Sequence, residues 1–411
     1  MNYQEAIVWL NEQNRFVKTP TLAPMQGLLA RLGHPDNEFA TIHIAGTNGK
    51  GSTASFTARL AMSHGLKTGL YTSPHLVRYE ERIVVSGQPI SEGDFVRLLT
   101  QVQKEMQDVH PVFDVLTAMA LLYFAEQQCE VVVLEAGLGG MYDATNAISS
   151  PTVSVITSIG FDHMERLGHT LSLIAVQKAG IIRQKTPVVL GELRSEADSV
   201  IKEVATIRHA PLYCPVPEQV ASSRTGTTFV LDKRSWQIPL LGQHQAQNAA
   251  MAIEAFSLCA KALGYQVSQQ KLQSGLLATT WPGRLEILQR EPFLILDGAH
   301  NEEGIGALVQ SIRDLQLAPL VLVFAMLKEK EPDAILGPLL PFAKRLILTN
   351  IANPRVLSPL NLIQWAGIGE IIQEPFFAVQ SALGRAQPGE TVLVAGSLYL
   401  IGEVRKAWSE R

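Results

Sequence analysis

The stretch Thr41–Ser52, with the sequence TIHIAGTNGKGS, decides the fold. Its first five residues predict a short buried strand, and Gly46–Ser52 forms a glycine-rich turn before a helical pattern that runs from about Ser52 to Ser63. A phosphate-binding loop requires this strand–turn–helix context. Glycines let backbone N–H groups face an anion, the helix N-terminus adds partial positive charge, and Lys50 can neutralise phosphate oxygens.

The spacing of this loop departs from the standard GxxxxGK[ST] pattern. That pattern would need glycine at position 44, which is Ile44, and Gly51 separates Lys50 from the hydroxyl residue Ser52. The alternative interpretation is an ordinary glycine-rich turn with a surface lysine. Three glycines and a lysine between a strand and a helix favour nucleotide binding. The motif alone does not separate a kinase, a ligase, a switch protein or a pump.

Strands and helices alternate around this loop. Apolar strands are expected at 67–72, 130–135, 152–158 and 186–190, with helices at 112–128 and 171–179. Buried strands separated by helices predict an α/β fold with a largely parallel sheet that is covered on both faces.

The pattern changes between Pro211 and Leu241, where apolar and polar residues alternate and predict a small antiparallel piece. A helix is expected from about His244 to Leu263, and Trp281-Pro282-Gly283 then breaks the chain. A second α/β series follows, with strands expected near 293–296, 320–324, 345–348 and 391–395. We therefore predict two domains, 1–283 and 284–411.

Composition narrows the class of protein. The 411 residues are 46% hydrophobic and 18% charged with a formal net charge of −4, which does not favour general binding to nucleic acid or anionic membranes. The cysteines Cys129, Cys214 and Cys259 are too scattered for a disulfide framework or a zinc site, and we expect all three to be small buried side chains. No signal peptide is evident, and the longest apolar run, 318–327, is too short to span a bilayer. We expect a cytoplasmic protein.

Ordered segments along nearly the whole chain carry a family resemblance. Together they resemble the folylpolyglutamate synthase and dihydrofolate synthase family, within the Mur ligase superfamily. The segments are GTNGKGS (46–52), SPHL (73–76), LEAGLGG (134–140), DATN (143–146), TSIGFDH (157–163), KAGI (178–181), GQHQ (242–245) with Asn248-Ala249, WPGR (281–284), DGAHN (297–301) and GSLY (396–399).

The resemblance implies a two-domain α/β fold, with an N-terminal P-loop domain whose mostly parallel sheet is flanked by helices and a smaller, Rossmann-like C-terminal domain. It also implies an ATP-dependent ligase of folate biosynthesis and one-carbon metabolism. ATP would phosphorylate a folate-type carboxylate to an acyl phosphate, which the amine of L-glutamate then attacks. Phosphoryl transfer of this kind needs a cradle for the phosphates and Mg²⁺ to bridge their oxygens.

The same resemblance assigns site residues. Ser73, Glu135 and His163 match ligands of Mg²⁺, with two ions expected, and Lys178 matches a lysine that is carbamylated in related enzymes. The nucleotide would be held by Thr47, Asn48, Gly49, Lys50, Gly51, Ser52, Asn248, Arg284 and Asp297. Lys50, Lys178 and His300 are the expected catalytic residues, and Phe113, Asp143, Ala144 and Thr145 would bind the pterin substrate. These assignments put ATP between the two domains.

Alternatives remain at this point. A Mur-type ligase acting on a peptidoglycan precursor would usually carry an N-terminal UDP-sugar domain, for which the start of the phosphate loop near residue 46 leaves no room. A P-loop ATPase would predict the strict motif, and a non-catalytic nucleotide-binding module would not need so many metal-type ligands. Within the family, the enzyme can add the first glutamate to dihydropteroate, extend the tail of a reduced folate, or do both, and we favour both. We expect a monomer.

Overall fold

The computed structural model describes residues 1–14 and 20–411. The chain forms two compact units. The first comprises Met1–Glu218, Val230–Trp236 and Gln247–Thr279, and the second comprises Gln219–Phe229, Gln237–Ala246 and Thr280–Arg411.

The first unit contains the larger sheet. Its strands are β1 (Ala40–Ala45), β2 (Thr68–Tyr71), β3 (Ile83–Val85), β4 (Gln88–Pro89), β5 (Val131–Glu135), β6 (Val153–Ile156), β7 (Val188–Leu190) and β8 (Leu212–Tyr213). Among the described residues they run in the order β4-β3-β2-β5-β1-β6-β7-β8. The neighbours β2-β5-β1-β6-β7-β8 pair in parallel, whereas β3 pairs antiparallel with both β2 and β4 at one edge. The expected largely parallel sheet is therefore confirmed.

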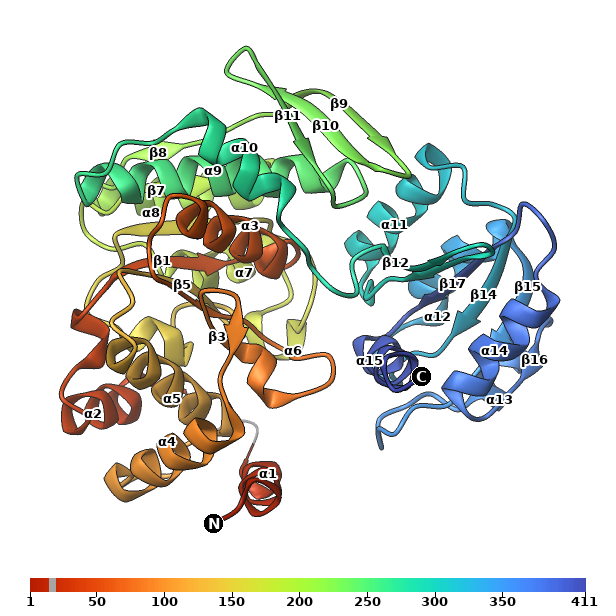
Figure 1. The fold of residues 1–411 in the computed structure, drawn as a ribbon, viewed down its shortest axis with the longest axis horizontal. Coiled ribbons are helices and arrows are strands. Elements are labelled where there is room, and N and C mark those ends of the chain that lie inside the picture. Colours follow the sequence, from red (N-terminus) through yellow and green to blue (C-terminus); the bar gives the residue numbers. More distant parts are fainter. Residues whose placement is uncertain (15–19) are drawn as a thin grey trace. The chain divides into compact units, whose positions relative to one another are not determined.

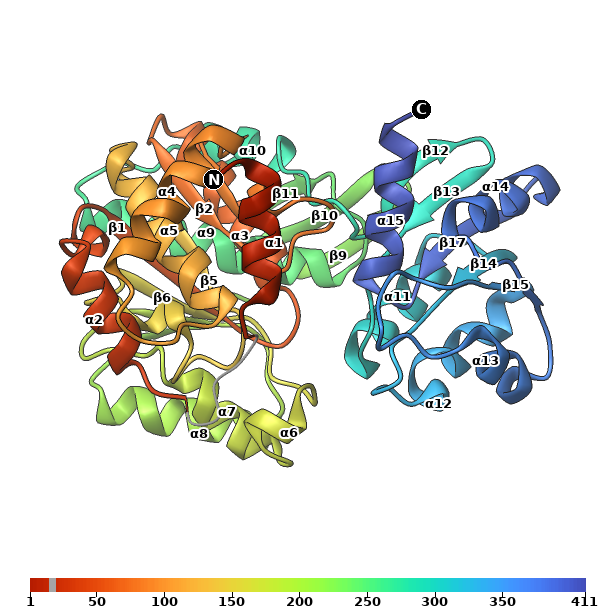
Figure 2. The same cartoon turned by 90° about the horizontal axis from the view of Figure 1, so that it is seen from below.

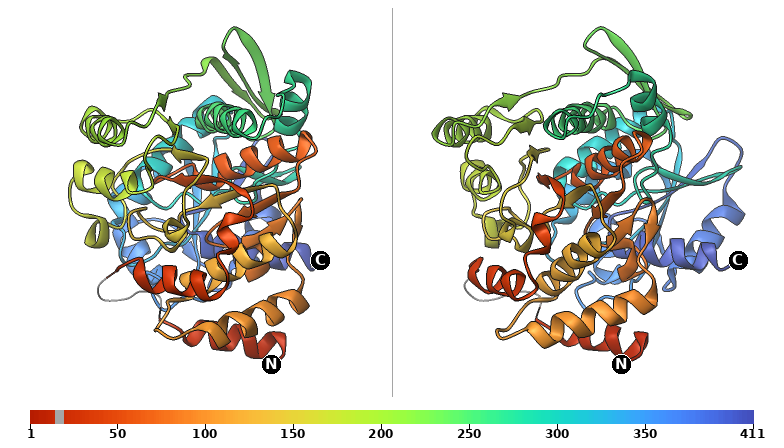
Figure 3. Two further views of the ribbon diagram at one scale, coloured as in Figure 1. Left: turned by 90° about the vertical axis from the view of Figure 1, so that its left-hand side faces the viewer. Right: turned by 60° about the vertical axis from the view of Figure 1, so that its left-hand side comes forward.

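Helices cover both faces of this sheet. They are α1 (Tyr3–Glu12), α2 (Ala23–Arg31), α3 (Lys50–Ser63), α4 (Glu92–Glu105), α5 (Val112–Glu126), α6 (Met164–Leu167), α7 (Leu171–Ala179), α8 (Ser195–Ile207), α9 (His244–Ala262) and α10 (Gln269–Leu277), with 3₁₀ turns η1 (Pro35–Asn37), η2 (Tyr79–Arg82) and η3 (Ala144–Ala147). Figures 1 and 3 show α3 on one face of the sheet and α5 on the other.

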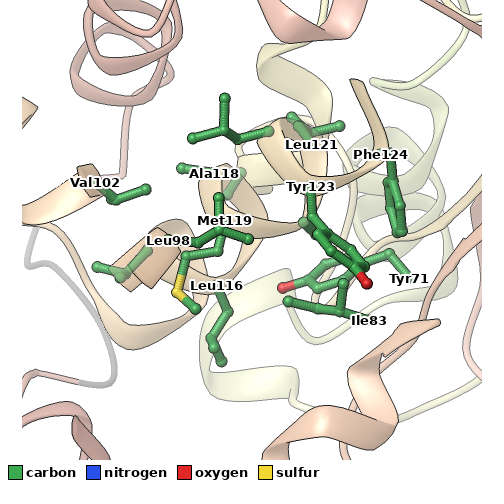
Figure 4. Packing of buried hydrophobic residues seen from close by; sticks show 14 of the residues in the cluster. Tyr71, Ile83, Leu98, Val102, Leu116, Ala118, Met119, Leu121, Tyr123 and Phe124 are labelled. Carbon is green, nitrogen blue, oxygen red and sulfur yellow. The ribbon is translucent and has the colours of Figure 1, made fainter. Parts of the chain in front are cut away.

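The core on the α5 side explains why this helix is apolar all round its surface. Side chains of α4 and α5, among them Leu98, Met119 and Phe124, gather with Tyr71 and Ile83 of the sheet (Figure 4). A helix packed against both a sheet and a second helix buries almost its whole circumference, so a one-sided apolar stripe does not develop.

Strand β1 lies at the point where the strand order of the sheet reverses. It has β5 on one side and β6 on the other, so the connection from β5 to β6 passes from one side of β1 to the other. Ligands of open α/β sheets bind beyond the carboxyl ends of the strands at such a point. The loop after Ala45 occupies this position.

The second unit has its own sheet and core. Strands β12 (Glu286–Arg290), β13 (Phe293–Leu296), β14 (Leu320–Phe324), β15 (Ala343–Leu348), β16 (Glu370–Ile371) and β17 (Thr391–Ala395) run in the order β12-β13-β17-β14-β15-β16. All neighbouring pairs are parallel except β12 with β13, which makes the sheet mixed.

Helices cover the second sheet as well. They are α11 (Glu302–Asp314), α12 (Pro332–Ile335), α13 (Pro359–Ala366), α14 (Pro375–Arg385) and α15 (Leu398–Ser409), with the 3₁₀ turn η4 (Gly337–Phe342). Apolar residues of α11, α12 and α13 share one core with the strands, whereas α14 and α15 pack together beside β17 (Figure 2).

Three short strands, β9 (Glu218–Ser223), β10 (Gly226–Leu231) and β11 (Arg234–Ile238), form a separate small sheet in the order β11-β10-β9. A small β-structured piece is therefore present in this region, as the alternating pattern predicts. The apolar run 318–327 contains the buried strand β14. No helix in the described parts of the chain is long and apolar enough to cross a membrane.

One expectation about cysteine is wrong. Cys129 and Cys259 are buried, but Cys214 is exposed. It lies directly after β8, which is the last strand at one edge of the first sheet, so no further strand covers it.

Candidate functional site

The phosphate loop folds around the carbonyl group of Gly46. Lys50, the first residue of α3, directs its Nζ back to the carbonyl oxygens of Gly46 and Thr47, each at 3.1 Å. Lys178 of α7 is 2% exposed and places its Nζ 2.7 Å from the same Gly46 oxygen. Two of the three expected catalytic residues therefore meet at one atom of the loop.

The segment after β6 holds the loop from the side. The backbone N–H of Asn48 donates to Ser158 Oγ at 2.9 Å, and Thr157 Oγ1 donates to the Asn48 carbonyl oxygen at 2.7 Å. Thr47 Oγ1 accepts from the Gly160 N–H at 3.0 Å. Sequence reasoning named this segment only as a family match. Its position after a parallel strand adjacent to β1 is the signal that could have revealed its role.

Two glycines of the loop leave no room for a side chain. A Cβ on Gly46 would lie 1.9 Å from Thr157 Oγ1. Gly49, the N-cap of α3, has φ +82°, and a Cβ there would lie 2.4 Å from Oδ1 of Asn248 on α9. The structure thus brings the predicted nucleotide residue Asn248 against the loop. The first backbone N–H groups of a helix have no acceptor within the helix, so they suit an anion.

Two predicted metal ligands lie together at the ends of adjacent strands. Glu135 ends β5 and is 3% exposed, and its Oε2 accepts the backbone N–H of Ser73, which follows β2, at 3.1 Å. Within the described residues, no group of three or more His, Cys, Asp or Glu side chains could hold a metal ion. Magnesium keeps several waters and often takes only one or two protein oxygens besides substrate phosphates. A buried carboxylate bound to the backbone of a serine, whose hydroxyl offers a further oxygen ligand, therefore fits Mg²⁺.

The third predicted ligand, His163, has different surroundings. It precedes α6 with a left-handed backbone at φ +49°, and its side chain is 51% exposed. Its ring nitrogens lie 4.0 Å from Asp162 Oδ1 and 3.9 Å from Glu165 Oε1. Both carboxylates belong to residues close to His163 in the chain.

The segment predicted to bind the pterin is held from within. Asp143 is 6% exposed, and its Oδ2 accepts the Leu138 N–H at 2.8 Å. Its Oδ1 accepts the Thr145 N–H at 3.1 Å and the Thr145 hydroxyl at 2.5 Å. Burial raises the pKa of Asp143 to about 6 despite these donors. Ala144 is also buried, so the side chains of this segment shape the loop.

Phe113, at the start of α5, lies beside this loop. Its ring is 5.7 Å from the ring of Tyr71, and a Cβ on Gly137 would lie 2.6 Å from its edge. The glycine therefore lets the backbone approach the edge of the aromatic ring. A partly buried ring next to a glycine-rich loop is suited to stacking on a planar ligand.

In the second unit, the predicted residues gather after β13. Asp297 is buried, and its carboxylate oxygens accept the N–H groups of Leu285 and Ala299, both at 2.9 Å. Burial raises the pKa of Asp297 above its usual value, and the neighbouring Arg284 guanidinium offsets only part of this rise. His300 Nδ1 lies 2.8 Å from the Gly298 carbonyl oxygen. Since that carbonyl can only accept, Nδ1 carries the proton and donates.

Comparisons with known proteins show which family the chain is similar to. The Mur ligase middle domain family matches residues 44–256, and the Mur ligase glutamate ligase domain family matches residues 283–398. The "Dihydrofolate synthase/folylpolyglutamate synthase" of Bacillus subtilis is 35% identical over 424 residues, with 98% of each chain covered.

Solved structures are similar over the same length. The Mycobacterium tuberculosis folylpolyglutamate synthase complexed with ADP has a TM-score of 0.91 at 30% identity and covers 99% of this chain and 98% of its own. The Escherichia coli FolC in complex with DHPP and ADP has a TM-score of 0.90 at 29% identity and covers 100% and 98%. This chain belongs to the folylpolyglutamate synthase and dihydrofolate synthase family of the Mur ligase superfamily.

Proposed function

We propose that this protein is an ATP-dependent ligase that joins L-glutamate to a folate-type carboxylate. The observation that carries the proposal is the loop at Gly46–Ser52, anchored at the carboxyl end of β1 by two lysines, in a chain whose full-length relatives are named folylpolyglutamate and dihydrofolate synthases. This function is favoured over a peptidoglycan ligase or a P-loop ATPase because the relatives named as folate ligases are similar to nearly the whole chain.

The reaction would take place in two steps. A carboxylate oxygen of the folate-type substrate attacks the γ-phosphorus of ATP, which gives an acyl phosphate and ADP. The glutamate nitrogen then attacks the acyl carbon, the bond from that carbon to the phosphate oxygen breaks, and the nitrogen loses a proton. Positioning and neutralisation of charge supply most of the catalysis in phosphoryl transfer.

The residues of the first unit have defined parts in this scheme. The N–H groups of Gly49, Gly51 and Ser52 would bind the β- and γ-phosphates. In the same loop, Asn48 is held in place by Ser158 and Thr47 by Gly160. Lys50 would neutralise the transferred group, and Asn248 would contact the nucleotide from α9. The N-terminus of α3, 14 residues long, adds its dipole to the phosphate site.

Glu135 and Ser73 would hold Mg²⁺, which supplies charge neutralisation for the phosphate oxygens when bound. Assignment of a second ion to His163 rests on the family pattern. Lys178 is proposed as the carbamylated lysine, with its nitrogen donating to Gly46 as in the structure. Carbamylation would turn a buried cation into a buried anion near the phosphate loop.

In the second unit, Arg284 would bind phosphate and Asp297 the ribose, while His300 would face the γ-phosphate. The domain division 1–283 and 284–411 is part of the same proposal.

The acceptor side is proposed for Phe113 and the loop of Asp143, Ala144 and Thr145. The complex of FolC with DHPP and ADP, and the folylpolyglutamate synthase complex with AMPPCP and folate, support an acceptor of the folate type. We infer a bifunctional, monomeric, cytoplasmic enzyme that has no nucleic-acid or membrane partner.

The test is phosphate release with Mg·ATP and L-glutamate, comparing dihydropteroate with tetrahydrofolate. Release with both acceptors establishes a bifunctional synthase, and release with one alone assigns the branch. Release that needs neither acceptor contradicts the ligase and favours an ATPase.

A further inference from the structure

We propose that His43 is a positioning residue for the acceptor, which it orients through Thr145 and Asp143. This inference rests on the proposed function, because it assigns a task to the loop that would bind the acceptor. His43 lies within β1 and is 0% exposed, and no assignment above uses it.

The link consists of two hydrogen bonds in sequence. His43 Nε2 lies 2.7 Å from Thr145 Oγ1, and Thr145 Oγ1 lies 2.5 Å from Asp143 Oδ1. His43 and Thr145 are separated by 102 positions in the chain. All three side chains are buried, so water does not compete for these bonds.

The direction of each bond follows from the donors available. A threonine hydroxyl has one hydrogen, and an ionised carboxylate can only accept, so Thr145 donates to Asp143. The hydroxyl oxygen must then accept from His43, which places the histidine proton on Nε2. Burial and the nearby Arg183 lower the pKa of His43 to about 3, so the ring stays neutral and keeps this single tautomer.

The far end of the link closes the acceptor loop. Asp143 binds the N–H groups of Leu138 and Thr145 with its two oxygens, and so joins the two ends of the segment 138–145. Removing the Thr145 hydroxyl would leave Asp143 with two donors in place of three. Removing the His43 ring would leave the Thr145 oxygen without its donor.

The near end of the link is the strand that leads into the phosphate loop. β1 ends at Ala45, and Gly46 begins the loop that would hold ATP. One strand therefore carries the phosphate loop at its end and fixes the acceptor loop through its middle. This arrangement fixes the acceptor loop relative to β1, which favours a near-attack geometry in the first step.

The experiment measures KM for the acceptor and KM for ATP separately. Thr145→Val and His43→Leu should each raise the acceptor KM about tenfold, the effect of one buried hydrogen bond. KM for ATP should change less than about twofold, because Gly46 keeps its bonds from Lys50 and Lys178. The double variant should be little worse than either single variant, since both break the same link.

Conservative variants and a control separate positioning from general stability. Thr145→Ser and His43→Gln, which restore a hydroxyl and a side-chain N–H respectively, should recover most of the loss. Ser154→Ala removes a buried hydroxyl on the adjacent strand β6, whose bond goes to the Ile181 carbonyl oxygen, and should leave the acceptor KM unchanged. Equal increases in the two KM values, or an unchanged acceptor KM in Thr145→Val, would overturn the proposal.

Hydrogen exchange keeps the test independent of the proposed function. In the intact protein, the amides of Leu138 and Thr145 should exchange faster in His43→Leu than in wild type. Unchanged exchange contradicts the link itself. If His43→Leu speeds exchange but the wild-type protein shows no acceptor-dependent phosphate release, the proposed function fails while the link stands.

Discussion

The Nζ of Lys178 donates to the carbonyl oxygen of Gly46 at 2.7 Å, from a side chain that is 2% exposed. A buried cation is costly unless it is paired with acceptors, so this contact both satisfies the lysine and fixes the first peptide of the phosphate loop. Lys178→Met, which keeps the volume and removes the donor, should lower kcat about tenfold or more. The measurement is the initial rate of phosphate release.

The control is Lys271→Met at an exposed position of α10, which should retain the wild-type rate. Carbamylation has its own test. A carbamylated Lys178 predicts that activity rises when bicarbonate is added to carbon-dioxide-free buffer. No response to bicarbonate would leave the lysine acting as an amine.

Lys50→Ala should abolish turnover with little loss of structure. Lys50 is the first residue of α3 and bonds to carbonyl groups of its own loop, so the fold does not depend on it for core packing. Without it the β- and γ-phosphates lose their point charge, and kcat should fall at least about a hundredfold. Turnover and the circular dichroism melting curve are measured together, with exposed Lys67→Ala as the control. Near-normal turnover would show that the loop does not bind ATP as proposed.

Glu135→Gln should weaken the dependence on magnesium. The substitution keeps the shape of the side chain and an oxygen for the Ser73 N–H, but removes the negative charge that a hard cation requires. We expect the Mg²⁺ concentration for half-maximal activity to rise about tenfold, the loss of one charge-assisted contact. Glu130→Gln, immediately before β5, provides a control from the opposite end of the same strand. If both variants titrate alike, Glu135 does not hold the metal.

Gly49→Ala should impair ATP binding because the new Cβ would clash with Asn248. Gly65 serves as the control, since its backbone is equally strained but it has no such neighbour. Both Gly49 and Gly65 have left-handed backbones, at φ +82° and +89°, near opposite ends of α3. Alanine costs about 1–2 kcal/mol at each because of this backbone. Only at Gly49 would the new Cβ lie 2.4 Å from Asn248 Oδ1, whereas nothing lies within 4 Å at Gly65.

Calorimetric titration with ADP measures the difference. Gly65→Ala should bind ADP normally, and Gly49→Ala should bind at least about tenfold more weakly because the loop must shift. Similar affinity in the two variants would mean that Asn248 yields to the added methyl group.

The pH dependence of acceptor binding should follow Asp143. Burial, with a smaller contribution from the Asp114 carboxylate, raises its pKa from 3.8 to about 6, while His43 stays neutral throughout this range. Below about pH 6 the protonated carboxyl accepts fewer hydrogen bonds, so the acceptor KM should rise as the pH falls, whereas KM for ATP should not. Asp143→Asn should remove this dependence, and a wild-type profile that is flat between pH 5 and 7 would contradict the assignment.

The sign for stability is the opposite. Because the folded pKa lies above the unfolded value, the contribution of Asp143 to folding is greatest below pH 3.8 and is lost as the pH rises through about 6. We therefore expect the difference in melting temperature, Asp143→Asn minus wild type, to be more positive at pH 7 than at pH 5. The carboxylate is thus retained at a cost to stability, as expected of a group that shapes a binding loop.

Local pattern was enough to predict most of the fold. The helix at 171–179 forms with the expected bounds, and the expected strand at 293–296 is β13. The helix after the phosphate loop begins at Lys50 and not near Ser52, because Gly49 in the left-handed region serves as its N-cap. Apolar periodicity does not reveal such a start, since the first turn of α3 has no apolar stripe.

The contacts of the site were harder to predict. The bonds from Asn48 to Ser158 join residues 110 positions apart, and the bond from Lys178 to Gly46 spans 132 positions. A single sequence places these residues at strand ends but contains no information on which loops touch. His43 was missed because a histidine inside an apolar strand has no motif, and only its bond to Thr145 gives it a task.

The two compact units are not continuous in sequence. The first is completed only by Val230–Trp236 and Gln247–Thr279, after the chain has already entered the second. During synthesis, the segments Gln219–Phe229 and Gln237–Ala246 therefore leave the ribosome well before Thr280–Arg411, to which they belong. A chain that ends at residue 279 would contain both segments but not the rest of the second unit against which they pack. The first unit is therefore not expected to fold well when it is expressed alone as residues 1–279.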